Sequence, residues 1–241
     1  MTSLSHKTPV QKMTRPAETP CWKRTLDVVF ILLTLPFVLP LAVLVAVLIR
    51  MVSAGPVLFR QERVGYLGRK FMCFKFRTMF VGAETTTHQG HLQHLMKSDA
   101  PMVKLDARGD LRIIPFGLLL RSSGLDELPQ LINVLRGEMS LVGPRPCLPY
   151  ECDDYLPWQR ERFNTLPGLT GLWQVSGKNG TTFAEMMQLD ISYAREKTLW
   201  LDLTIILKTI PAILGQICYA RKQKKTLPLE AQAPRPYQSN L

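Results

Sequence analysis

Apolar residues in this chain gather into two long runs, with shorter patterned segments between them. The first run, residues 28–49, is almost wholly apolar and has about the 20 residues that a helix needs to cross a bilayer. The second run, residues 199–217, is strongly apolar but contains two charged residues and a proline. It predicts either a core helix or a helix in the membrane interface. Trp200 at its start and the basic cluster at residues 221–225 favour the interface.

Two prolines, Pro36 and Pro40, interrupt the first apolar run. Each removes a backbone hydrogen bond and kinks a helix. Basic residues flank both ends of the run, and the positive-inside rule then places both ends in the cytoplasm. A re-entrant helix that enters the membrane, bends at Pro36 and returns satisfies both observations. The alternatives are a spanning helix and a signal peptide, although the run is long for a signal peptide and prolines are unusual within one.

A β-hairpin is predicted from two short runs rich in β-forming residues, 56–63 and 70–77, with two glycines between them. Alternation along the second strand places Lys75 and Arg77 on one face and three apolar residues on the other. Two cations on one face indicate either phosphate binding or a solvated strand face.

Two adjacent carboxylates, Asp126 and Glu127, open a segment whose apolar residues recur at helical spacing. The pattern predicts Asp126 as the N-cap, Pro129 in the first turn, and an end at Gly137. The positive end of a helix dipole favours ionised carboxylates and attracts phosphate. A carboxylate beside a bound phosphate is a metal ligand or a nucleophile. The alternative is that the two acids merely cap a helix.

Further along, Arg145 stands between two prolines that hold it on a stiff, extended backbone. Its planar guanidinium suits phosphate oxygens. Residues 167–171 form a glycine-rich segment, predicted to be a tight loop whose N–H groups approach a ligand.

The chain has 241 residues and a formal net charge of +11, which indicates nucleic acid, an anionic membrane or a phosphorylated substrate as a partner. Basic patches interleaved with aromatic residues are not evident, so we expect the membrane and not nucleic acid. The five cysteines form no C-x-x-C pair, which favours reduced thiols in the cytoplasm. His88, His91 and His94 have helix-compatible spacing, but further zinc ligands are not evident.

Three motifs together closely resemble the signature of the monotopic phosphoglycosyl transferases, the bacterial sugar transferases that start polysaccharide assembly. They are SSGLDELPQLINVLRGEMSLVGPRP at residues 122–146, FKFRTM at 74–79 and PGLTGLWQVSGK at 167–178. The resemblance runs from about residue 22 to residue 220.

This resemblance implies an α+β, mostly helical fold with a re-entrant membrane helix, interfacial amphipathic helices and a small β-hairpin. The expected organisation is a disordered basic tail at 1–21, the re-entrant helix at 22–50, a catalytic domain at 51–220 and a flexible tail at 221–241. The catalytic domain would face the cytoplasm on the bacterial inner membrane, and a homo-oligomer is possible.

The implied reaction moves a sugar 1-phosphate from a UDP-sugar to undecaprenyl phosphate and releases UMP, as the first membrane step of exopolysaccharide, capsule or O-antigen synthesis. Asp126 would attack the β-phosphate and help to hold Mg²⁺, and Glu127 would act as a base or a ligand of the metal shell. The remaining predicted site residues have three roles. Arg121 and Arg145 would hold phosphate oxygens, and Lys23 and Arg24 would meet the polyprenyl phosphate headgroup. The residues that would bind the nucleotide or shape the site are Lys75, Arg77, Gly168, Thr170 and Gly171. The competing interpretations are a glycosyltransferase that releases UDP and a non-enzymatic membrane-docked scaffold.

Overall fold

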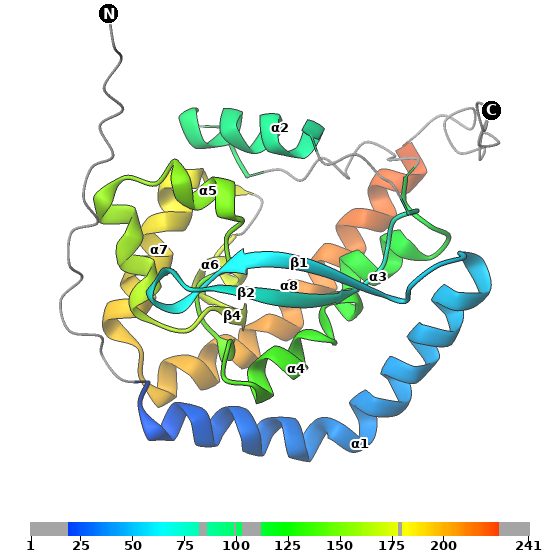
Figure 1. Ribbon diagram of the computed structural model, residues 1–241, viewed down its shortest axis with the longest axis horizontal. Helices are drawn as coiled ribbons and strands as arrows, with labels where there is room; N and C mark the ends of the chain where they lie inside the picture. Colours follow the sequence, from blue (N-terminus) through cyan, green and yellow to red (C-terminus); the bar gives the residue numbers. More distant parts are fainter. Residues whose placement is uncertain (1–18, 82–85, 99, 103–111, 178–179, 227–241) are drawn as a thin grey trace, which may run out of the picture.

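The computed structural model describes residues 19–81, 86–98, 100–102, 112–177 and 180–226 (Figure 1). The predicted α+β, mostly helical class with a small hairpin is confirmed. The elements are α1 (Cys21–Val52), β1 (Leu58–Val64), η1 (Tyr66–Gly68), β2 (Lys70–Phe76), α2 (Thr86–Lys97), α3 (Gly117–Ser123), η3 (Leu125–Glu127), α4 (Gln130–Leu135), β3 (Ser140–Val142), α5 (Pro149–Asp153), η4 (Pro157–Asn164), β4 (Gly168–Thr170), α6 (Leu172–Val175), α7 (Phe183–Glu196) and α8 (Leu199–Thr226). Most of the two predicted tails lies outside the described residues, although α8 continues past the expected boundary at residue 220.

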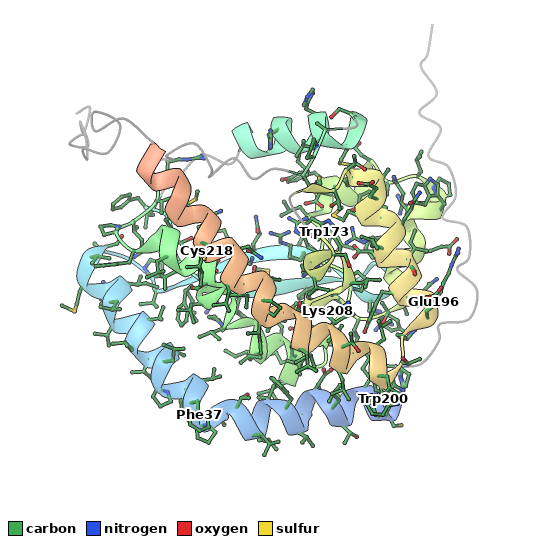
Figure 2. All side chains as sticks on the ribbon, turned by 180° about the vertical axis from the view of Figure 1, so that it is seen from behind. Phe37, Trp173, Glu196, Trp200, Lys208 and Cys218 are labelled. Carbon is green, nitrogen blue, oxygen red and sulfur yellow. The ribbon has the colours of Figure 1, made fainter. Side chains whose placement is uncertain are left out.

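Helix α1 is a single 32-residue helix with both prolines inside it. The ribbon bends near its middle, where Phe37 lies (Figures 1 and 2). Both halves pack on the same body, since Ile31 in the first half joins the buried cluster around Val134 and Val45 in the second half joins the cluster around Phe76. A re-entrant helix enters and leaves a membrane on the same side, so both of its ends must lie against the same folded domain. Both halves of α1 meet this requirement.

The outer surface of α1 is strongly apolar. Phe37 and Met51 are 79% and 77% exposed. An 18-residue stretch of α1 has a mean hydropathy of 2.9, and a stretch of the same length within Leu199–Cys218 of α8 has a mean hydropathy of 1.5. Only 11% of each stretch is buried inside the protein. By length and composition, both helices are able to cross a membrane.

The predicted hairpin is confirmed. Strands β1 and β2 pair antiparallel, with Leu58 opposite Phe76 and Val64 opposite Lys70. Helix α4 runs along the outer edge of β2, where the fully buried Asn133 accepts a hydrogen bond from the Phe74 N–H at 3.1 Å and donates one to the Met72 carbonyl at 2.7 Å. This amide completes the hydrogen bonding of the strand edge and holds α4 and the preceding η3 turn against β2.

A second, parallel pair of strands was not predicted. β3 pairs with β4, with Ser140 opposite Gly168 and Val142 opposite Thr170. The sequence analysis took residues 167–171 as a loop, because three-residue strands carry too little alternation to be recognised.

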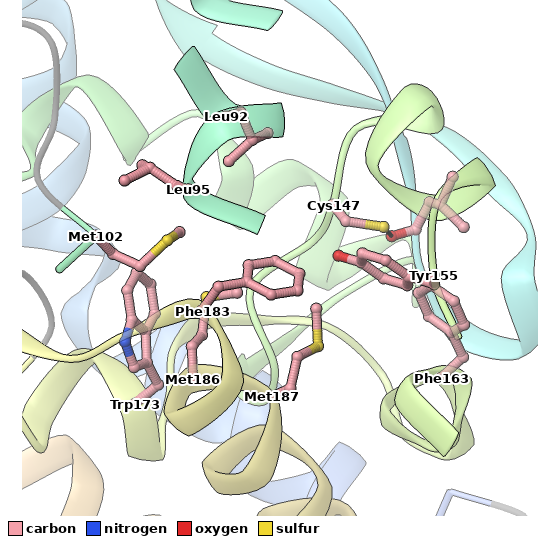
Figure 3. Packing of buried hydrophobic residues seen from close by; sticks show 11 residues of the cluster. Leu92, Leu95, Met102, Cys147, Tyr155, Phe163, Trp173, Phe183, Met186 and Met187 are labelled. Atoms are coloured by element: carbon pink, nitrogen blue, oxygen red, sulfur yellow. Dashed lines mark hydrogen bonds between the residues drawn. The ribbon is translucent and has the colours of Figure 1, made fainter. Parts of the chain in front are cut away.

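The sequence of residues 182–197 also predicts a helix, and α7 confirms it. Thr182 and Glu185 form a capping box, in which the Glu185 N–H donates to the Thr182 hydroxyl and the Glu185 carboxylate accepts from the Thr182 N–H. The same helix supplies Phe183, Met186 and Met187 to a buried cluster that also includes residues from α2 and η4 (Figure 3).

Candidate active site

The acidic pair lies in a 3₁₀ turn between two short helices. Gly124, with φ +73°, ends α3, and Asp126 and Glu127 follow in η3. The prediction that Asp126 is the N-cap of one continuous helix is therefore wrong, because Pro129 occupies that position before α4. The predicted end at Gly137 is correct, since its φ is +77° just after α4. The carboxylates are thus placed by a tight turn and not by the first turn of a helix.

The apolar residues of this turn explain its orientation. Leu125 and Leu128 pack against the cluster formed by the second half of α1, the end of the hairpin and α3. With these two side chains directed inward, Asp126 and Glu127 between them are half-buried at the boundary with solvent.

Lys75 is the basic residue that the structure joins to the acidic pair. Its ammonium donates to Oε1 of Glu127 at 2.7 Å, and the two side chains are 25% and 36% exposed. Lys75 comes from β2, on the hairpin side of the turn. This contact brings a predicted nucleotide residue directly to the predicted catalytic carboxylates.

The two predicted phosphate arginines come from different elements. Arg121 lies in the last turn of α3, five residues before Asp126, and is partly buried. Arg145 follows β3, with its Nη1 3.5 Å from Oε2 of the fully buried Glu151. Its side chain keeps 26% of its surface exposed.

Arg77 contacts the backbone that follows α1. It is buried, and its guanidinium donates to the Ala54 carbonyl at 2.8 Å and to the Ser53 carbonyl at 2.9 Å. These carbonyls follow the end of α1. Arg77 therefore closes the connection between α1 and the hairpin.

Lys23 and Arg24 are also engaged elsewhere. Lys23 is completely buried, and its ammonium donates to Asp202 Oδ2 at 2.6 Å, to the Tyr193 hydroxyl at 2.8 Å and to the Val142 carbonyl at 2.8 Å. Arg24 donates to the Val134 and Leu135 carbonyls at the end of α4. Lys23 is thus held inside the protein by its ion pair with Asp202, and its contact with a lipid headgroup stays a prediction.

The glycines of β4 serve backbone packing. A Cβ on Gly168 would lie 2.0 Å from the Gly143 nitrogen, and a Cβ on Gly171 would lie 2.2 Å from the Gly143 carbonyl oxygen. The Thr170 hydroxyl is 2.7 Å from that of Thr209 on α8. These three residues fasten β3, β4 and α8 together, and their predicted role in binding the nucleotide or in shaping the site stays a prediction.

The sequence analysis missed a buried ion pair, Arg162 with Asp190. Both side chains are 1% exposed, and Arg162 also donates to the Tyr155 hydroxyl and to the Arg145 carbonyl at 2.7 Å each. Arg162 thereby ties η4 and α7 to the backbone of the predicted phosphate arginine. The available signal in the sequence was a charged residue, Arg162, inside an otherwise patterned segment. That signal did not reveal its partners, because Arg145 and Asp190 lie 17 and 28 residues away along the chain.

Comparison with known proteins agrees with these motifs. A family model described as Bacterial sugar transferase matches residues 18–216. The chain is 42% identical over 200 residues to the UDP-glucose:undecaprenyl-phosphate glucose-1-phosphate transferase of Caulobacter vibrioides, covering 80% of this chain and 69% of that protein. It is 38% identical over 196 residues to the exopolysaccharide production protein ExoY of Sinorhizobium fredii, covering 79% and 84%. It is 40% identical over 200 residues to the UDP-galactose-lipid carrier transferase of Erwinia amylovora, covering 80% of this chain and 40% of that protein.

The family model spans most of the chain, and the first two relatives align along more than two thirds of their own length. The family resemblance carried by the three sequence motifs is therefore confirmed, and the chain belongs to the bacterial sugar transferase family of enzymes.

Proposed function

We propose that this enzyme transfers a sugar 1-phosphate from a UDP-sugar to undecaprenyl phosphate and releases UMP, as the first membrane step of exopolysaccharide, capsule or O-antigen synthesis. The observation that carries the proposal is the half-buried acidic turn with Lys75 2.7 Å from Glu127. The names of the relatives from Caulobacter and Erwinia support the donor and acceptor classes.

In the first step, a carboxylate oxygen of Asp126 attacks the β-phosphorus of the UDP-sugar. A bond forms between that oxygen and phosphorus, and the bond from phosphorus to the bridging oxygen of UMP breaks. The electron pair leaves with UMP, and the sugar 1-phosphate stays on Asp126 as an acyl phosphate. Arg121 and Arg145 would hold phosphate oxygens, since positioning and charge neutralisation supply most of the catalysis of phosphoryl transfer.

In the second step, a phosphate oxygen of undecaprenyl phosphate attacks the same phosphorus. The bond to Asp126 breaks, the carboxylate is restored, and undecaprenyl diphosphate sugar is the product. Lys75 holds Glu127 beside the nucleophile throughout, so that the second carboxylate stays oriented.

Magnesium is the cofactor that the family resemblance implies, and the acidic turn fits it. Mg²⁺ is commonly held by one or two carboxylates, with water and substrate phosphates completing its shell. Asp126, and Glu127 if it serves the metal shell, would be the ligands that the protein supplies. When bound, the ion would neutralise charge on the phosphate oxygens.

The placement at a membrane rests on the exposed apolar surface. Besides α1, large apolar side chains are exposed on the neighbouring helices: Leu118 and Leu119 on α3, Ile132 and Leu135 on α4, and Leu207, Ile210 and Leu214 on α8. Water disfavours so much exposed apolar surface, and a bilayer would cover it. We place α1 as a re-entrant helix in the bacterial inner membrane, with the catalytic domain on the cytoplasmic face.

The decisive experiment follows the covalent step. The purified enzyme is mixed with each of a panel of UDP-sugars in the absence of undecaprenyl phosphate. Intact-mass spectrometry then measures the mass of the protein, and nucleotide analysis identifies the nucleotide that is released. We expect a mass increase of one sugar phosphate and a stoichiometric burst of UMP, both lost in Asp126→Asn. Release of UDP instead of UMP would identify an ordinary glycosyltransferase, and full activity in Asp126→Asn would remove the nucleophile assignment.

A further inference from the structure

Two exposed arginines from different elements meet over one aromatic ring. The guanidinium carbon of Arg60, on β1, lies 5.8 Å from the centroid of Phe74, and that of Arg136, at the end of α4, lies 5.1 Å from the same centroid. Arg60 stands directly opposite Phe74 in the hairpin register, and the buried Asn133 fixes α4 to the same strand. The ring thus holds two cationic groups close together on a rigid support.

Both guanidinium groups keep their hydrogen-bond donors available. Within the part of the chain that the structure describes, neither side chain donates to an acceptor or forms an ion pair. The neighbouring acids are already occupied: Glu62 accepts from Lys70 at 2.9 Å, and Glu138 accepts from Asn133 at 2.6 Å. Two like charges held together without a counterion favour an anion between them.

The arginine pair lies at the edge of the exposed apolar surface. Arg136 directly follows Leu135, which is 45% exposed, and Ile132 on the same helix is 42% exposed. Arg24, near the start of the apolar helix α1, donates to the Leu135 carbonyl and so ties this end of α4 to α1. A forked cation at the edge of an apolar surface is the arrangement that contacts lipid phosphate.

We propose that Arg60 and Arg136, with Phe74 between them, form a binding site for the phosphate headgroup of an anionic bilayer phospholipid. The site rests on the membrane placement proposed above but not on the transfer reaction. By strand alternation, Phe74 and Lys75 project from opposite faces of β2, so this site is separate from the acidic turn.

The test counts lipids and needs no turnover. The full chain is reconstituted in bilayers of equal phosphatidylglycerol and phosphatidylcholine and extracted in mild detergent, and native mass spectrometry counts the lipids retained. We expect the wild type to retain phosphatidylglycerol preferentially. Arg60→Gln/Arg136→Gln should lower that preference by about fivefold for each arginine removed.

The matched control is Arg69→Gln/Arg195→Gln, which removes the same charge at the hairpin turn and on α7, away from Phe74, and should keep the preference. Thermal unfolding confirms that both variants fold. Three results would overturn the site: an unchanged preference in the first variant, an equal loss in the control, or displacement of phosphatidylglycerol by inorganic phosphate. An Asp126→Asn enzyme should retain phosphatidylglycerol as the wild type does, which separates this outcome from failure of the proposed reaction.

Discussion

The Lys75 ammonium lies 2.7 Å from Oε1 of Glu127, although the two residues are 52 positions apart in the chain. The contact joins the hairpin to the acidic turn and is only partly open to water, with 25% of the lysine side chain exposed. A positive group at this distance orients the second carboxylate beside Asp126, where the proposed transfer would use it.

Loss of the Lys75 cation should therefore slow the reaction. We expect Lys75→Met to lower kcat by about 10- to 100-fold, the range for losing a charged hydrogen bond of partial burial. Lys75→Arg should recover part of the rate. Lys70→Met is the control, because Lys70 lies on the same strand but pairs with the exposed Glu62. An unaltered kcat in Lys75→Met would show that the ion pair only stabilises the fold.

Lys23 should behave as a structural cation. Lys23→Met leaves the buried Asp202 without its cation, and we expect a destabilisation of about 3–5 kcal/mol. Thermal unfolding in detergent measures it. Lys23→Met/Asp202→Asn should recover part of the loss because the buried charge is gone. If Lys23→Met instead kept full stability and raised only the KM for undecaprenyl phosphate, Lys23 would be a headgroup ligand after all.

The packing role of Gly168 predicts a folding defect instead of a binding defect. Gly168→Ala places a Cβ 2.0 Å from the Gly143 nitrogen, where backbone atoms cannot move aside cheaply. We expect a fall in Tm and in the yield of folded protein, with an unchanged KM for the UDP-sugar in the fraction that folds. Gly180→Ala, with no atom within 4 Å of the added Cβ, should match the wild type. A raised KM at normal stability would restore the nucleotide role.

The topology of α1 is open to chemical labelling. Cys21 at its start is exposed, and Ala54→Cys introduces a second exposed thiol just after its end. A membrane-impermeant maleimide, with peptide mass mapping, should modify both positions in inverted inner-membrane vesicles and neither in right-side-out vesicles. Labelling of the two positions from opposite sides would mean that α1 spans the bilayer.

Two neighbouring thiols should respond differently to pH. A hydrogen bond from Cys147 lowers the pKa of Cys152 to about 7, whereas that same bond and burial raise the pKa of Cys147. Since the thiolate is the reactive form, alkylation of Cys152 by iodoacetamide should rise through a midpoint near pH 7 while Cys147 stays unmodified. Cys147→Ala removes the donor and should move the midpoint up towards the ordinary value of 9.0. A midpoint that does not move would show that the hydrogen bond is absent.

Short-range patterns were enough to predict several elements. The alternation and the glycines around residue 66 predicted the hairpin, and residues 182–197 were predicted to be the helix that the structure shows as α7. The unbroken apolar run with Pro36 and Pro40 indicated a bent helix, and the ordered motif around Asp126 indicated the family. These features depend on neighbours within a few residues, so the linear chain contains them.

The roles of the basic residues were decided only by the tertiary structure. Lys23, Lys75 and Arg77 are equally positive in the sequence, but folding buries the first against Asp202, aims the second at Glu127 and turns the third to the end of α1. An ammonium or guanidinium is directed by the acceptors that surround it, and here these come from distant segments. The sequence therefore determined the hairpin, the long apolar helix and the family, whereas the packing of α1, the hairpin and α8 determined which cation contacts the acidic turn.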